Sequence, residues 1–132
     1  MHELSVCLAM LDEVARIAHL ADAHAVRSVT VRVGPLSGVE AGLLARVFEV
    51  ARRRTIAEDA KLIFDVARVR VRCMSCAGEN EAAPNRLLCA RCGSYRTRVV
   101  EGDELTLSAV EMDIPGVEAS VADDKSVIQV LN

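Results

Sequence analysis

The chain has 132 residues, of which 52% are hydrophobic and 27% are charged. This length accommodates one modest domain, or one small domain with a smaller inserted module, and it excludes a large multidomain enzyme. Aromatic residues make up only 2%, which disfavours a protein that stacks single-stranded bases on exposed rings. The net charge of −3 hides an uneven distribution, because residues 68–98 contain 7 basic and 2 acidic side chains. This basic segment in an acidic protein keeps nucleic acid under consideration as a partner.

No stretch approaches the roughly 18–20 uncharged apolar residues that a membrane span needs. The N-terminal segment lacks the basic region of a signal peptide and meets Asp12 and Glu13 too early. We therefore expect a cytoplasmic protein with no membrane partner. Five cysteines in a reducing compartment do not indicate a disulfide framework, and four of them fall in two CxxC pairs, leaving Cys7 over. This cysteine usage indicates metal binding.

The first half of the chain predicts a helix, a strand and a second helix. Apolar residues recur at spacings of three and four from Leu4, which predicts an amphipathic helix ending near His24. Valine alternates with polar residues between positions 29 and 33, and this period of two predicts a half-buried strand that stops at Gly34-Pro35. Helical spacing returns between residues 44 and 51, which predicts a second helix packed on the same sheet.

Two later segments, 62–72 and 104–112, are strand-like, and each shows a slip in its alternation. A slip of one residue exchanges the two faces of a sheet, so we expect a bulge or a change of packing partner near Ala67 and near Ala109. The simplest topology pairs these two segments and inserts the cysteine-containing segment between them. The predicted domains are therefore a discontinuous main domain (1–67 plus 104–113), an insert (68–103) and a tail (114–132). The tail opens with Pro115-Gly116 and is expected to be a mobile terminus rather than a strand.

The two CxxC pairs are separated by 12 residues, and each short loop can direct two thiolates at one ion. Four sulfur ligands at about 2.3 Å close a tetrahedral zinc shell, which leaves no position for water and makes the metal structural rather than catalytic. A redox CxxC motif is the competing interpretation, but such motifs occur singly at the head of a helix. Gly78 and Gly93 follow the pairs, where tight turns let backbone amides approach the sulfurs. The predicted zinc ligands are Cys73, Cys76, Cys89 and Cys92.

Arginines surround the cysteines, and Arg68, Arg70 and Arg72 share one strand face. They form either a phosphate-binding patch or a solvated face that keeps a small module soluble. At the N-terminus, Met1-His2-Glu3 places an amine, an amide and an imidazole within two residues, a set that can chelate Ni(II) or Cu(II) in one plane. An N-terminal histidine is also commonly an idle exposed side chain, and both interpretations stay open from the residues alone.

The opening MHELSVC, the segment VGPLSGVE (33–40) and the paired CxxC motifs together resemble the HypA/HybF family of hydrogenase-maturation nickel metallochaperones. The resemblance runs from residue 1 to about residue 113. It implies an α+β fold with two domains. Two helices packed on a three-stranded sheet form the nickel domain, and a small β zinc-ribbon domain is inserted in it. It also implies transfer of Ni(II), structural Zn(II), and as partners a maturation GTPase and the large subunit of nickel–iron hydrogenase, with urease maturation proteins in some organisms.

Carried over residue by residue, the resemblance places nickel on His2 through its side chain and backbone, with Glu3 nearby and Glu40 as the acid after Ser37-Gly38-Val39. Glu40 has a second interpretation as the first residue of the second helix, where the helix dipole favours a carboxylate. The remaining candidates are Cys7, interpreted as a core thiol, and His19 and His24 near the end of the first helix.

The leading hypothesis is thus a nickel metallochaperone that binds Ni(II) at its N-terminus and delivers it for hydrogenase maturation. The alternative is a zinc-ribbon adaptor for nucleic acid or transcription that uses the arginine patch. A metal-dependent enzyme is the third hypothesis, but no Ser-His-Asp grouping, phosphate loop or carboxylate pair supports catalysis. We therefore expect a protein that is not an enzyme.

Overall fold

The computed structural model describes residues 2–129, with side chains described up to residue 116. Helix α1 (His2–Leu20) leads into strand β1 (Ala25–Val33), and helix α2 (Ala41–Ala51) precedes strand β2 (Lys61–Val66). Helix α1 ends before the predicted His24 because Asp22 adopts a left-handed φ of 56°. The turn is closed by the Ala23 N–H, which donates to the Ala18 carbonyl at 2.9 Å. Both predicted helices and the predicted first strand are confirmed.

The main sheet has the strand order β2-β1-β6-β7, where β6 spans Leu105–Ile114 and β7 spans Val117–Gln129. The expectation that the two slipped segments pair with each other is wrong, because β1 lies between them, parallel to β2 and antiparallel to β6. The reason lies in the crossover, since a strand–helix–strand unit returns its second strand parallel and adjacent to the first. Strand β6 then occupies the other side of β1.

Both predicted slips have a structural cause. Near Ala67 the chain leaves the main sheet and enters a second sheet of order β4-β3-β5, so the packing partner changes. This sheet is built from β3 (Arg70–Cys73), β4 (Glu79–Glu81) and β5 (Thr97–Glu101). Near Ala109 the register against β1 jumps from Thr30↔Ala109 to Val31↔Leu107. One extra residue therefore bulges from β6 at the predicted place.

The tail expected to be mobile adds a strand to the main sheet. The chain turns back at Pro115-Gly116, where Gly116 has a φ of 80°, and β7 then pairs antiparallel with β6. The sheet therefore has four strands, of which three are those implied by the family resemblance. The charged residues 123–125 misled the prediction, because an edge strand can carry charges as long as its backbone finds a partner.

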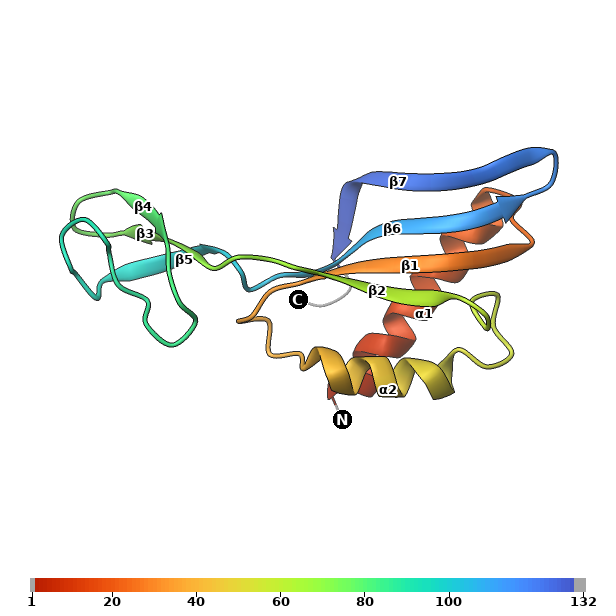
Figure 1. The fold of residues 1–132 in the computed structure, drawn as a ribbon, viewed down its shortest axis with the longest axis horizontal. Coiled ribbons are helices and arrows are strands. Elements are labelled where there is room, and N and C mark those ends of the chain that lie inside the picture. The colour runs from red at the N-terminus through yellow and green to blue at the C-terminus, as the bar shows by residue number, and fades with distance from the viewer. Residues whose placement is uncertain (1, 130–132) are drawn as a thin grey trace.

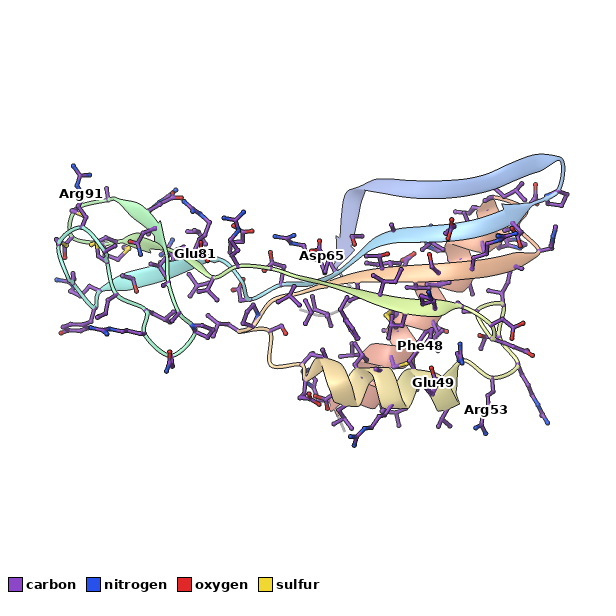
Figure 2. The ribbon with its side chains drawn as sticks, in the orientation of Figure 1. Phe48, Glu49, Arg53, Asp65, Glu81 and Arg91 are labelled. Atoms are coloured by element: carbon purple, nitrogen blue, oxygen red, sulfur yellow. The ribbon has the colours of Figure 1, made fainter. Side chains whose placement is uncertain are left out.

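The two helices cover one face of the main sheet, and the second sheet extends from one end of it (Figure 1). The core lies between helices and sheet and is mostly aliphatic. Its fully buried aromatic residue is Phe48, which is 1% exposed and points from α2 toward the sheet (Figure 2). Arg52 covers the ring, with its guanidinium carbon 5.7 Å from the ring centre. Within residues 2–129, no helix combines the length and apolar character that crossing a bilayer requires.

Two glycines form the junction between the sheets. The Leu36 N–H donates to the Gly102 carbonyl at 2.8 Å, and the Gly34 N–H donates to the Glu104 carbonyl at 2.8 Å. A Cβ atom at Gly34 would lie 2.2 Å from the Gly102 oxygen, and Gly102 itself has a φ of 113°. The outgoing and returning chains can therefore approach this closely only because both positions lack a side chain.

We predict that Gly34→Ala lowers the free energy of unfolding by about 1–3 kcal/mol, because the new methyl group forces the two chains apart. Chemical denaturation followed by circular dichroism measures this change. Gly78→Ala is the matched control, since a Cβ there meets its nearest atom at an ordinary 3.4 Å. Equal stability of the two variants would contradict the proposed tight crossing.

Candidate metal centres

The four paired cysteines converge at the end of the second sheet. Cys73 is the last residue of β3, Cys76 follows in the next turn, and the second pair precedes β5. All four Sγ atoms lie within 4.8 Å of one another, and the Cys73–Cys92 and Cys76–Cys89 sulfur distances are both 3.6 Å. Tetrahedral ligands at about 2.3 Å from zinc stand about 3.8 Å apart. The residues therefore fit the predicted zinc ion.

Backbone amides donate hydrogen bonds to two of the four cysteine sulfurs. The N–H groups of Ser75 and Cys76 donate to the Cys73 sulfur at 3.3 and 3.4 Å, and those of Arg91 and Cys92 donate to the Cys89 sulfur, each at 3.4 Å. The amide of Cys76, followed by that of Ser75, lowers the pKa of the Cys73 thiol to about 6 against the opposing effect of burial. The thiolate of Cys73 is thus favoured at neutral pH. At Cys92 the Ser94 amide lowers the pKa, but hydrogen bonds with the Cys73 and Cys89 sulfurs outweigh it and raise the pKa to about 11, so zinc binding there displaces a proton.

The two cysteine turns have matching backbones but different residues at their tightest point. Ala77 and Gly93 each follow the second cysteine of a pair, with φ values of 64° and 75°. Their N–H groups donate to the carbonyls of Cys73 and Cys89 at 3.0 and 2.9 Å. The expected tight turns, with backbone amides close to the sulfurs, are confirmed, and the left-handed residue of the first turn is Ala77 rather than a glycine.

The arginine patch is largely neutralised by neighbouring carboxylates. Arg72 bonds Glu79 at 2.9 and 2.5 Å, Arg70 lies 3.8 Å from the same carboxylate, and Arg68 lies 3.7 Å from Glu81. Because these acids come from β4 on the adjacent edge of the same sheet, the folded chain pairs charges that are separated in sequence. This arrangement favours the solvated-face interpretation over a phosphate-binding one. Arg91 lies at the end of the insert (68–103) that is farthest from the main sheet (Figure 2).

The predicted nickel residues lie where α1 and α2 begin, but their ligand atoms do not form a cluster. Within residues 2–129, the four cysteines are the group of three or more potential ligands whose donor atoms lie within 4.8 Å of one another. His2 is the first residue of α1, and its Cε1 atom lies 4.0 Å from the position of a Cβ at Gly38, in the loop before α2. Glu3 is only 9% exposed, and its Oε2 accepts the Glu40 N–H at 3.2 Å. That amide, followed by its own amide, holds the pKa of the Glu3 carboxyl below its ordinary value. Glu3 is therefore a carboxylate at neutral pH.

Glu40 has the structural role that was left open as its second interpretation. It is the N-cap of α2, where its side chain accepts the Gly42 N–H at 3.1 Å and the Leu43 N–H at 2.6 Å. These bonds satisfy helix amides that have no partner within the helix. A metal ion would therefore have to share the Glu40 carboxylate with the cap.

The remaining candidates are not brought into a metal cluster among residues 2–129. Cys7 is fully buried in the core, and burial raises the pKa of its thiol to about 11. This confirms its interpretation as a core thiol. His19 lies in the last turn of α1 and His24 in the turn that follows, at the opposite end of the helix from His2.

We predict that one Zn(II) ion copurifies with the chain and that Cys76→Ser unfolds mainly residues 68–103. Structural zinc contributes on the order of 10–16 kcal/mol of apparent binding energy in finger peptides, and the second sheet has few buried residues to replace it. Elemental analysis and amide exchange measure the two effects. Ser75→Ala is the control, because Ser75 lies in the same turn without supplying a sulfur. An insert that remains protected after zinc chelation would contradict the prediction.

The model of a family described as hydrogenase/urease nickel incorporation metallochaperone HypA matches residues 1–112. The hydrogenase maturation factor HypA of Nitrosospira multiformis is 43% identical over 112 residues, covering 85% of this chain and 97% of the relative. That of Aquifex aeolicus is 34% identical over 114 residues, covering 86% and 99%.

The fold gives the same result as the sequence. The solution structure of the nickel metallochaperone HypA from Helicobacter pylori superimposes with a TM-score of 0.66 at 25% identity, covering 85% of this chain and 97% of that one. Both helices, the two sheets and the four-cysteine cluster agree with the fold that the sequence resemblance implied. The matched family model and these relatives together show that this chain belongs to the HypA family of nickel-incorporation metallochaperones.

Proposed function

We propose that this chain binds Ni(II) beside the first turn of α1 and delivers it for maturation of nickel–iron hydrogenase. The observation that carries the proposal is that His2, Glu3 and Glu40 lie at the ends where both helices begin, with the Glu3 carboxylate bonded to the Glu40 amide. An imidazole, an ionised carboxylate and a second carboxylate are ligands that nickel accepts. The proposed partners are a maturation GTPase and the hydrogenase large subunit, with urease maturation as a further destination, and the proposed location is the cytoplasm.

The backbone supplies further donors for the nickel ion. The first N–H groups of a helix have no partner within it, so the amides of His2 and Glu3 are free of the helical ladder. The amide of His2, once deprotonated, completes the planar set of amine, amide and imidazole that the sequence suggested, together with the His2 imidazole and the amine of Met1, which lies outside the described residues. Glu3 or Glu40 adds a carboxylate from the side.

The charges at this site suit an ion that must be released. The N-terminal ends of α1 and α2 both present the positive end of a helix dipole, which opposes a cation. The carboxylates of Glu3 and Glu40 offset this field. The ion therefore depends on a few nitrogen and oxygen donors, of which His2 and Glu40 are exposed, in contrast to the closed sulfur shell of the zinc centre.

We predict that His2→Ala weakens Ni(II) binding by about 100-fold or more while zinc content and fold are unchanged, because His2 is exposed and supplies the imidazole. Isothermal titration of Ni(II) into the zinc-loaded chain measures this loss. His19→Ala is the matched control on the same helix. Unchanged nickel affinity in His2→Ala would show that the site is wrongly placed. One residue added before Met1 also weakens binding if the amine is a ligand.

A second pair of variants separates ligand roles from structural roles. Glu3→Gln keeps an oxygen that accepts the Glu40 N–H, and Glu40→Asn keeps a residue that caps helices well, but each removes a negative charge. We expect each variant to retain the wild-type melting temperature within a few degrees and to weaken nickel binding by about tenfold. If a variant binds nickel with unchanged affinity, the carboxylate that it lacks is not a nickel ligand.

A further inference from the structure

The free edge of the main sheet carries a sequence that is complementary to itself when it is read backwards. β2 is the outermost strand beside β1 in the order β2-β1-β6-β7. Antiparallel pairing of residues 61–65 with themselves places lysine opposite aspartate, leucine opposite phenylalanine, and isoleucine opposite isoleucine. We propose that two copies of this chain associate through β2, antiparallel, about a two-fold axis at Ile63.

The backbone of β2 has the correct phase for this pairing. The Ala67 N–H donates to the Val33 carbonyl at 2.9 Å. Along a strand, the backbone N–H and C=O groups of successive residues point alternately to one neighbouring strand and to the other. Those of the odd-numbered residues therefore point to β1, and those of Leu62 and Phe64 point to the free edge. With the axis at Ile63, Leu62 of each copy lies opposite Phe64 of the other, and their amides and carbonyls meet. Ile63 then faces its own copy in the closer, non-hydrogen-bonded type of pair.

The side chains select this register over its neighbours. Lys61, Ile63 and Asp65 share the exposed face of the strand, whereas Leu62 and Phe64 are partly buried against the core. An axis at Ile63 creates two Lys61–Asp65 pairs and joins the two apolar pairs on the inner face. An axis moved by one residue to Phe64 keeps the backbone phase but sets Asp65 opposite Ile63, and Lys61 opposite Ala67. Only the first register pairs every charge.

Asp65 has spare capacity for a lysine from a second copy. Its Oδ2 atom lies 3.3 Å from Arg32, but the same guanidinium is 2.7 Å from Glu101 and 3.6 Å from Glu104. Three carboxylates therefore share one cation at the end of β2 near the junction between the sheets (Figure 2). The side chain of Asp65 is 55% exposed, so a lysine can reach it.

The insert (68–103) does not obstruct the pairing. The chain leaves the end of β2 toward the insert (68–103), here called the zinc module, which projects from that end of the sheet (Figure 1). A two-fold axis reverses the second copy, so its zinc module projects in the opposite direction. Association also covers Ile63, which is 40% exposed on an edge that would otherwise be an open template for strand addition. Two sheets of four strands thereby become one continuous sheet.

Sedimentation equilibrium of the full, zinc-loaded chain over a range of concentrations tests the proposal. We expect a monomer–dimer equilibrium whose dissociation constant rises about tenfold or more in Lys61→Glu, because each of two attractive pairs becomes repulsive. Adding Asp65→Lys to this variant restores association by exchanging the charges. Arg53→Glu, an equal charge change at an exposed position away from β2, is the control. A monomer at every concentration, or association unchanged by Lys61→Glu, overturns the proposal.

Cysteine cross-linking tests the register. Under mild oxidation with oxidised glutathione we expect Ile63→Cys to form a reducible covalent dimer, because the two Ile63 positions face each other at the axis. Lys61→Cys alone does not, since its two positions lie four residues apart along the paired strands, whereas Lys61→Cys with Asp65→Cys does. The unsubstituted chain controls for the native cysteines. Equal cross-linking of the Lys61→Cys and Ile63→Cys variants excludes the Ile63-centred register.

Discussion

The burial of the valines of β1 against the two helices determines where the metal sites lie. Val26, Val29, Val31 and Val33 are at most 5% exposed, so both helices must cover the same face of the sheet. Helix α1 turns directly into β1, and α2 leads from β1 to a parallel β2, so both helices run opposite to β1. Both therefore begin near the end of β1. The proposed nickel residues lie at that end, and Gly34, where the insert (68–103) joins, immediately follows β1.

The electrostatic environment of a cation differs between the zinc cluster and the proposed nickel site. At the zinc cluster, backbone N–H groups donate to the Cys73 and Cys89 sulfurs and so favour the thiolate forms that bind a cation. Where the helices begin, helix dipoles oppose a cation, and the Glu40 carboxylate is already used as a cap. At the proposed nickel site, the carboxylates available to a cation are thus the same groups that hold the fold together there.

Local patterns in the sequence predicted much of the fold, whereas the pairing of distant segments was harder to predict. Alternation located β1, and the slips at Ala67 and Ala109 located a change of sheet and a bulge. Alternation shows which face of a strand is buried, but not which strand is its neighbour. The position of β1 between β2 and β6 was therefore not predicted. The charges of the tail concealed β7, and no glycine marks the left-handed position that Ala77 takes in the first cysteine turn. Cysteine spacing predicted its cluster because zinc ligation restricts local geometry, whereas the contact of Glu3 with the Glu40 amide joins residues far apart in sequence.

The order of strands in the main sheet has a consequence for synthesis on the ribosome. β1 is hydrogen-bonded to β6, so the sheet that forms around residue 30 stays incomplete until residues 105–114 have left the exit tunnel. The four cysteines lie between these segments and are all translated before β6. Since chains fold as they emerge, the metal cluster can close on a nascent chain whose larger sheet still lacks a strand. The insert would then hold the ends of β2 and β6 close together, which shortens the loop that the late strand must close.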